Sequence, residues 1–259
     1  MEKNLVNKKN TKIITITMNR WHFYKKKFID YINLDSNFLL ISASLHEVKI
    51  LKGLGYSKFS ITYHDDDEKN QFLDFGFKEN INLFKSDLRN LTFKDKSFDY
   101  TVTNATIHHI DLPHKAITEL YRVAIKGVLI IESNDSLIMR LATKIKLAEE
   151  FEVSSVNEDK NTGGLLDTAI PNYVYRWTEK EIFKLLKSFD PKNINLVNFD
   201  YTSDLTNFKN RDSYIENILL KILIITGKIF FFFFKKQQNC MSIFIDKTKI
   251  KKRWPNKNY

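Results

Sequence analysis

The stretch Leu91–Glu132 reads LTFKDKSFDYTVTNATIHHIDLPHKAITELYRVAIKGVLIIE and decides the fold. Two segments within it, Phe98–Thr103 (FDYTVT) and Gly127–Glu132 (GVLIIE), are predicted to be strands. Earlier in the chain, Phe38–Ser42 (FLLIS) is a short continuous apolar run, which is typical of a parallel strand buried on both faces. Four apolar residues between Thr103 and Gly127 recur at the spacing of one helical face: Ala116, Ile117, Leu120 and Val123. A strand, a helix and a second strand in this order predict a right-handed parallel crossover.

The start of that helix has signals of its own. Asp111 is a residue type that caps helix N-termini, and Pro113 is tolerated in a first helical turn. We therefore expect the helix to begin just after Asp111, with the Asp111 side chain as its cap.

The alternation of strands and helices extends toward the N-terminus. Strands are predicted over Phe38–Ser42, Phe59–Tyr63 and Ile81–Phe84, with helices through Val48–Leu54 and Glu68–Phe75 between them. This order predicts a doubly wound α/β sheet that is covered by helices on both sides.

The pattern is less regular toward the C-terminus. An apolar helical pattern covers Leu137–Leu147, and Thr178 with Glu181 has the spacing of a capping box for a helix over Glu179–Ser188. Two late strands are also predicted: Ile194–Tyr201 and Cys240–Ile245.

Length and charge limit the classes of protein that fit. The chain has 259 residues, 43% of them apolar, which suits one α/β domain, and a net charge of +10. The charge lies at the ends, because residues 1–27 carry +7 and residues 247–259 carry +6, which leaves −3 for the middle. A nucleic-acid groove needs basic residues around the folded body, so no specific nucleic-acid partner is expected.

The compartment follows from cysteine usage and from the absence of a signal-peptide pattern at the N-terminus. A single cysteine, Cys240, excludes an intrachain disulfide, and we expect a cytoplasmic protein. The apolar segment Ile218–Phe234 is shorter than the about 20 residues that span a bilayer. We expect it to be a core helix that runs into an aromatic strand edge, with no transmembrane span, while peripheral contact with a membrane is left open.

The stretch around Leu91–Glu132 resembles the class I S-adenosylmethionine-dependent methyltransferase family, of the type 11 kind. In that family, a pattern like LPF.D.SFD.V.....LHH is followed by E..RVLKPGG.L.I.E. The matching residues are Leu91, Phe93, Asp95, Ser97, Phe98, Asp99, His108, His109, Glu119, Arg122, Val123, Lys126, Gly127 and Glu132.

The resemblance implies a Rossmann-like, seven-stranded sheet, mostly parallel, with Phe38–Ser42 central and Cys240–Ile245 antiparallel. The organisation expected from it is a methyltransferase domain over residues 31–246, with an inserted or appended segment over residues 133–192. Residues 1–30 are then a basic arm and residues 247–259 a basic tail.

The departures from the family pattern fall at the cofactor. The family's first loop is rich in glycine because bare backbone must approach the ligand at a sharp turn. Here the loop reads Ser42-Ala43-Ser44-Leu45-His46-Glu47, without glycine, and the family's Pro-Gly-Gly before the fifth strand is reduced to Gly127. These departures favour an alternative function, in which the fold has lost catalysis.

By resemblance, the residues that bind S-adenosylmethionine include Ser42 and Ser44 in the first loop. Asp65, after the second strand, would hold the ribose hydroxyls, although a solvated turn and helix cap is an equal alternative. Asp87 would accept the adenine amino group and Leu88 would pack near the ring, with a simple turn as the alternative for Asp87. Asn104 would contact cofactor or substrate at the carboxyl edge of the sheet.

His108 and His109 are the candidate catalytic residues. Removal of a proton from the acceptor helps methyl transfer to oxygen, and imidazole titrates near neutral pH. We favour His109 slightly as the base, and the alternative is that both rings pack beneath the cofactor. No metal site is expected, because the other histidines are scattered: His22, His46, His64 and His114.

Asn172–Trp177 (NYVYRW) resembles the tail of methyltransferases found among bacterial surface-glycan genes. Tyr175, Arg176 and Trp177 are therefore candidates for binding an acceptor, since aromatic planes and an arginine suit sugars and anions. The alternative is that they anchor the helix that follows.

These residues are compatible with two functions. The first is methyl transfer from S-adenosylmethionine to a hydroxyl or amine of a small molecule or glycan. The second is a non-catalytic binding or scaffolding module with a degenerate cofactor pocket. A nucleic-acid methyltransferase is disfavoured, because Asn104-Ala105-Thr106-Ile107 stands where an acidic-Pro-Pro-Tyr-like motif would handle a base.

Overall fold

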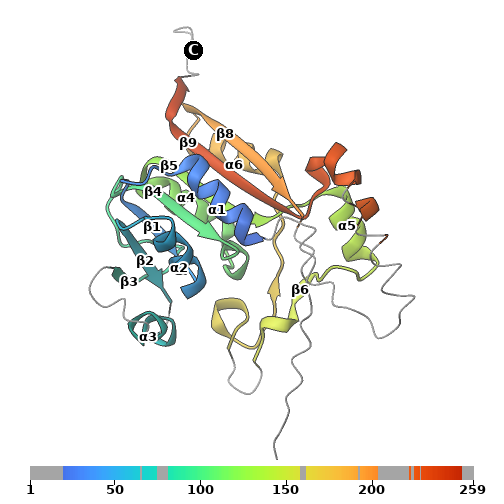
Figure 1. Cartoon of the computed structure of the whole chain (residues 1–259), viewed down its shortest axis with the longest axis horizontal. Coiled ribbons are helices and arrows are strands. Elements are labelled where there is room, and N and C mark those ends of the chain that lie inside the picture. The colour runs from blue at the N-terminus through green and yellow to red at the C-terminus, as the bar shows by residue number, and fades with distance from the viewer. Residues whose placement is uncertain are drawn as a thin grey trace, which may run out of the picture.

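The computed structural model describes residues 20–64, 66–74, 81–157, 162–191, 193–203, 222, 225–227 and 229–252. Its main element is a seven-stranded sheet of order β3-β2-β1-β4-β5-β9-β8 (Figure 1). The strands are β1 (Phe38–Ile41), β2 (Phe59–Tyr63), β3 (Asn82–Lys85), β4 (Phe98–Asn104), β5 (Ala124–Ser133), β8 (Asn193–Thr202) and β9 (Cys240–Lys252).

The sheet is parallel except for one strand. β1 pairs in parallel with β2 and β4, and β9 runs antiparallel to both of its neighbours, β5 and β8. The strand order reverses between β1 and β4, which makes the carboxyl ends of these two strands the expected place for a ligand. The predicted fold class, the central first strand and the single antiparallel strand are confirmed.

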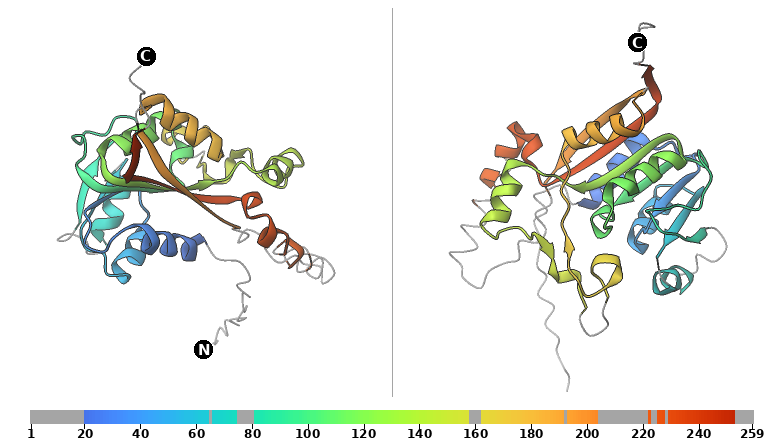
Figure 2. Two further views of the ribbon diagram at one scale, coloured as in Figure 1. Left: turned by 90° about the horizontal axis from the view of Figure 1, so that it is seen from above. Right: turned by 180° about the vertical axis from the view of Figure 1, so that it is seen from behind.

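Helices cover both faces of the sheet (Figure 2). One layer contains α1 (Arg20–Tyr31), α2 (Leu45–Gly53) and α3 (Asp66–Asp74), and the other contains α4 (Pro113–Val123) and α6 (Glu179–Phe189). Side chains of β1 alternate between the layers, so Phe38 and Leu40 join one core cluster while Leu39 and Ile41 join the other. This two-sided burial explains the continuous apolar run in the sequence.

The first helix places part of the predicted basic arm inside the domain. Phe23, Tyr24 and Phe28 of α1 are buried, and the Tyr56 hydroxyl donates to the Phe28 and Ile32 carbonyls. The folded domain therefore begins before the predicted end of the basic arm at residue 30. The basic residues of α1 lie on the same helix as a buried apolar face. Strand β9 likewise continues to Lys252, into the predicted tail.

The predicted cap of α4 is wrong. The helix begins at Pro113, so the capping position falls on Leu112, which offers no side-chain oxygen. Asp111 instead accepts hydrogen bonds from Arg89 at 3.2 and 3.3 Å.

In α6, Thr178 accepts from the Glu181 N–H as predicted. The Glu181 carboxylate accepts from the Tyr175 hydroxyl and lies 3.1 Å from His114 Nε2, so the predicted capping box forms only in its Thr178 half.

The segment Ile218–Phe234 differs from its prediction. Its described residues include a helical stretch over residues 229–233, and Phe232 and Phe233 are 71% and 72% exposed. Burial against the domain is therefore wrong for these residues, because helices already cover both faces of the sheet (Figure 2). No helix among the described residues is both long and apolar enough to cross a membrane.

Candidate functional site

Two adjoining cavities lie where the sheet reverses its strand order. The first, of about 290 Å³, is lined by residues that follow several strands, among them Ser42, His64, Asp87, Leu88, Thr106 and His109. The second, of about 410 Å³, is lined among others by Arg20, Trp21, Ser42, Ser44, Glu47 and Asn104. Ser42, Ala105 and Thr106 line both cavities, which therefore form one elongated cleft. Its size is that of small-molecule sites, about 300–1,000 Å³.

The first loop makes its sharp turn without glycine. Ser42 has a φ of 43° and Ala105, across the cleft, has a φ of 51°, both in the left-handed region. A side chain in this region costs about 1 kcal/mol or more in backbone strain, which the surrounding structure must offset. The Ser42 N–H donates to the Thr62 carbonyl at 3.1 Å and so ties the strained turn to β2. The loop thus keeps the turn, with serine in place of glycine.

A polar network lines the second cavity. Ser44 caps α2 in a full capping box with Glu47, whose carboxylate also accepts from the Asn104 amide at 3.1 Å. The Asn104 side-chain oxygen in turn accepts from the Arg20 guanidinium at 3.2 and 3.3 Å. Burial raises the pKa of Glu47, and Arg20 opposes that rise. The cavity therefore holds a cation and a buried carboxylate close together.

The remaining residues of the predicted loop lie in α2. Leu45 lines the second cavity, and the His46 ring packs edge-on against Trp21 at 4.5 Å between centroids. The large side chains are thus accommodated by the first turn of the helix and by α1.

Asp87 and Leu88, which the family resemblance assigns to the adenine of the cofactor, line the first cavity. The Asp87 carboxylate accepts from the Arg89 backbone N–H at 2.8 Å and from its guanidinium at 2.6–3.0 Å, and Arg89 lowers the pKa of Asp87. Leu88 is buried at the wall of the cavity. Asp65 lies outside the described residues, while its neighbour His64 lines the cavity.

Glu132 organises the turn that carries both histidines. The 3-10 helix η1 (Ile107–His109) follows β4, and the Thr106 and Ile107 N–H groups donate to Glu132 Oε1 at 2.9 and 2.8 Å. Glu132 Oε2 lies 3.0 Å from His108 Nδ1, and the Glu132 side chain is fully buried. Burial by itself would raise the pKa of Glu132, but His108 and the backbone donors hold it below its ordinary value.

The two histidines differ in charge. Burial disfavours the charged form of His108, but the Glu132 and Glu152 carboxylates outweigh it and raise the pKa of His108 to about 9. Burial and the neighbouring His108 cation lower the pKa of His109. At neutral pH, His108 is therefore a cation and has no lone pair to accept a proton. His109 is neutral at the same pH.

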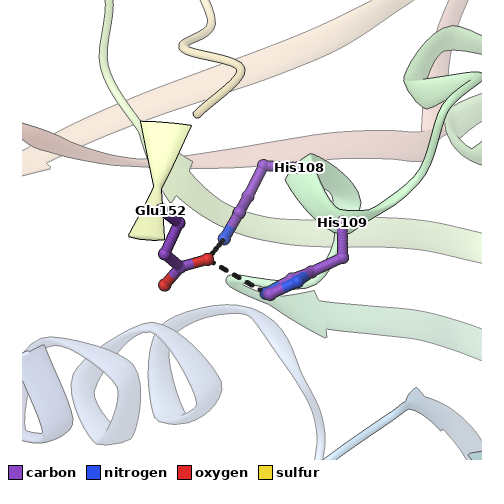
Figure 3. A group of neighbouring side chains, drawn as sticks. All are labelled: His108, His109 and Glu152. Atoms are coloured by element: carbon purple, nitrogen blue, oxygen red, sulfur yellow. Dashed lines mark ion pairs between the residues drawn. The ribbon is translucent and has the colours of Figure 1, made fainter. Parts of the chain in front are cut away.

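A small antiparallel sheet brings two further polar residues to η1. It pairs β6 (Phe151–Glu152) with β7 (Asn172–Tyr173). One oxygen of the Glu152 carboxylate faces both histidine rings (Figure 3), and the Asn172 amide is 2.6 Å from His109 Nδ1. Neither residue was predicted, because strands of two residues carry no periodicity that a sequence pattern could reveal. Arg20 was also missed, since it lies in what the charge pattern suggested was an arm.

The predicted acceptor residues Tyr175, Arg176 and Trp177 do not line either of the two cavities. Trp177 is fully buried in the core and packs against Tyr175 and His114, which favours the anchoring interpretation for this residue. Arg176 donates to the Glu149 carbonyl at 2.5 Å and to the Val174 carbonyl at 3.4 Å. Tyr175 is partly exposed and donates to Glu181.

Comparisons with known proteins agree with this fold. The profile of a methyltransferase domain family matches residues 48–131. A candidate methyltransferase of Bacillus halodurans is similar in structure, with a TM-score of 0.52, 12% identity, and coverage of 86% of this chain and 98% of that one. Magnesium protoporphyrin IX methyltransferase of Synechocystis is also similar in structure, with a TM-score of 0.50 and 12% identity. The match covers 86% of this chain and 80% of that one. No curated protein matches the chain in sequence.

Residues 48–131 therefore match a methyltransferase domain, and the whole sheet has the fold of the class I S-adenosylmethionine-dependent methyltransferases. The fold also occurs with another activity, since the [4+2]-cyclase SpnF is similar, with a TM-score of 0.50 and 9% identity over 87% of this chain and 80% of that one. Structural likeness at such low identity defines the fold and leaves the reaction to the site.

Proposed function

We propose that the chain transfers a methyl group from S-adenosylmethionine to a hydroxyl or amine of a small molecule or glycan. The observation that carries the proposal is the cleft at the strand reversal. Five residues predicted for the cofactor lie along its two adjoining cavities: Ser42, Ser44, Asp87, Leu88 and Asn104. When bound, S-adenosylmethionine supplies a methyl group activated by a positively charged sulfur.

The polar residues of the cleft suit the two ends of this cofactor. Asp87 offers acceptor oxygens for an adenine amino group beside the apolar wall of Leu88. At the other end, Arg20 suits a carboxylate and Glu47 suits an ammonium group, which are the charges of an amino acid. The charged groups of the cleft therefore fit the cofactor, although the first loop contains no glycine.

His109 is the residue that we assign to the acceptor proton. It is neutral, it lines the first cavity, and its side chain is 35% exposed, so an acceptor can reach Nε2. His108 is assigned a positioning role instead, because its charge is matched by Glu132. Tyr175 and Arg176 remain candidates for acceptor binding, and a glycan acceptor would use the tyrosine plane and the arginine charge.

Calorimetric titration of the full chain with S-adenosylmethionine, and with its demethylated product, tests the proposal. We expect both to bind at one site per chain. A well-folded chain that binds neither at millimolar concentration would instead support a non-catalytic binding module. The glycine-free loop and the engagement of Asp87 by Arg89 are the observations that favour this second function. If both bind, methyl transfer to sugars or to other small molecules distinguishes the acceptor classes.

We also propose a cytoplasmic protein that makes peripheral contact with membranes. None of the residues of α5 (Leu137–Lys144) is buried, and Leu137 is 69% exposed. α5 lies near the 3-10 helix η4 (Lys235–Gln237), which follows the exposed phenylalanines at 232–234. Apolar side chains beside lysines suit an anionic lipid surface.

Pelleting with vesicles tests this contact. The chain should sediment with vesicles that contain anionic lipid at low salt and return to the supernatant at moderate salt, because charge attraction is screened. The double variant Phe232→Ser, Phe233→Ser should bind the vesicles less. Recovery of the wild type only with detergent, or no binding to anionic vesicles at all, would contradict peripheral contact.

A further inference from the structure

The side chains of His108, His109 and Glu152 converge on one point beside the cleft (Figure 3). His108 Nε2 lies 3.4 Å and His109 Nε2 lies 3.6 Å from the same Glu152 oxygen, and the ligand atoms of all three residues lie within 4.8 Å of one another. From this geometry we propose that the three residues form a binding site for a divalent transition-metal ion.

The distances suit an ion better than direct hydrogen bonds. A separation of 3.6 Å is too long for a hydrogen bond, and 3.4 Å is near the limit. Glu152 Oε2 is a buried atom that has no hydrogen-bond partner among the described residues. Two ligands that each bind a zinc ion at about 2.0–2.2 Å in tetrahedral geometry lie about 3.4 Å apart. Small movements of the side chains would therefore complete the coordination.

The outer nitrogens of both rings have partners of the kind that orient metal-binding histidines. Such histidines donate their other ring N–H to a carboxylate or carbonyl. His108 Nδ1 faces Glu132, and His109 Nδ1 lies 2.6 Å from the Asn172 side-chain nitrogen. The Asn172 side-chain oxygen is buried without a hydrogen-bond partner among the described residues, and a half-turn of the amide would place it against Nδ1. His109 could then carry its proton on Nδ1 and keep the Nε2 lone pair for an ion.

A simple ion pair does not account for the whole arrangement. An ion pair between Glu152 and a charged His108 needs no second ring, yet the His109 ring lies 4.3 Å from that of His108 between centroids. A shared ion gives both rings and the carboxylate a common partner.

The ligand set indicates the class of ion and the place of its open position. Two imidazoles and one carboxylate suit zinc or ferrous iron better than magnesium or calcium, which prefer oxygen ligands alone. Three protein ligands leave at least one position for water or an acceptor oxygen. His109 lines the first cavity, so the site borders the cleft.

One consequence rests on the proposed function, although metal binding itself does not. The Nε2 atoms of both histidines can hold either a proton or an ion, so binding of an ion would release the Nε2 proton of the charged His108 to solvent. With an ion bound, a hydroxyl coordinated to it would have a lowered pKa, and the proton would leave to solvent instead of to His109.

Metal titration of the full chain tests the site without S-adenosylmethionine. After treatment with a chelator, the protein is titrated with Zn²⁺ in competition with a chromophoric chelator, and with Co²⁺ while visible absorption is recorded. We expect one ion per chain and the absorption of Co²⁺ at a site of low coordination number. Glu152→Gln and His109→Asn should each weaken Zn²⁺ binding by at least about tenfold.

Glu150→Gln is the matched control, because Glu150 is an exposed carboxylate two residues from Glu152 and outside the cluster. It should bind Zn²⁺ as the wild type does. The two ligand side chains are partly exposed, at 35% for His109 and 29% for Glu152, so their variants should fold, which circular dichroism can verify. A folded wild type that binds neither ion, or equal affinity in wild type and both ligand variants, would overturn the site.

Discussion

Replacing Glu132 with glutamine is expected to lower the free energy of unfolding by about 3 kcal/mol, because it leaves buried donors and a buried cation unmatched. Three donors converge on this carboxylate, from Thr106, Ile107 and His108. A glutamine has one acceptor oxygen and would point an NH₂ group at one of the donors. Urea unfolding in the presence of a chelator, followed by tryptophan fluorescence, measures the change.

Asp135→Asn is the control for this experiment. It makes the same carboxylate-to-amide exchange in an ion pair with Arg140, whose side chain is 57% exposed. Exposed pairs contribute about 0–1 kcal/mol, so its unfolding curve should lie close to that of the wild type. An unfolding midpoint for Glu132→Gln equal to that of the wild type would show that Glu132 does not organise the turn.

Replacing Asp87 with alanine is expected to weaken S-adenosylmethionine binding by about ten- to hundredfold, which corresponds to about 1.5–3 kcal/mol for a hydrogen bond to a charged group. The Asp87 carboxylate lines the first cavity, where it can accept from the adenine amino group. His109→Ala should change affinity much less and should instead lower turnover, because we assign it to the acceptor proton. Calorimetry and a methyl-transfer assay measure the two effects.

The control must separate the loss of the Asp87 carboxylate from the disturbance of its ion-pair partner Arg89. Asp111 is the second carboxylate bound by that guanidinium, and it does not line the cavity, so Asp111→Ala perturbs Arg89 while leaving the cavity's acceptor in place. Its affinity should stay close to that of the wild type. Tight wild-type binding that Asp87→Ala does not change would leave the methyltransferase proposal standing and show that the adenine end lies elsewhere.

The positions of Asp87, Leu88 and Asn104 were predictable because each lies at or just after the carboxyl end of a strand. Parallel strands end at the same edge of a sheet, so residues just after them meet there whatever their separation along the chain. Asp65 was predicted on the same ground and lies outside the described residues. Glu132 stood in the matched motif, but its role depends on donors from η1 that come together only on folding.

The sequence by itself determined the alternation of strands and helices and so the doubly wound α/β class, because apolar periodicity is local and each strand's run is read from a few neighbouring residues. The central first strand and the antiparallel strand were expected from the family resemblance, and the full strand order came from the tertiary structure. Only the tertiary structure decided the charges of the two histidines. Adjacent in sequence, they differ because the Glu132 and Glu152 carboxylates raise the pKa of His108, whereas burial and the neighbouring His108 cation lower the pKa of His109. It also decided that Arg20 and Glu152 reach the site, since local spacing does not encode which distant residues share a buried environment.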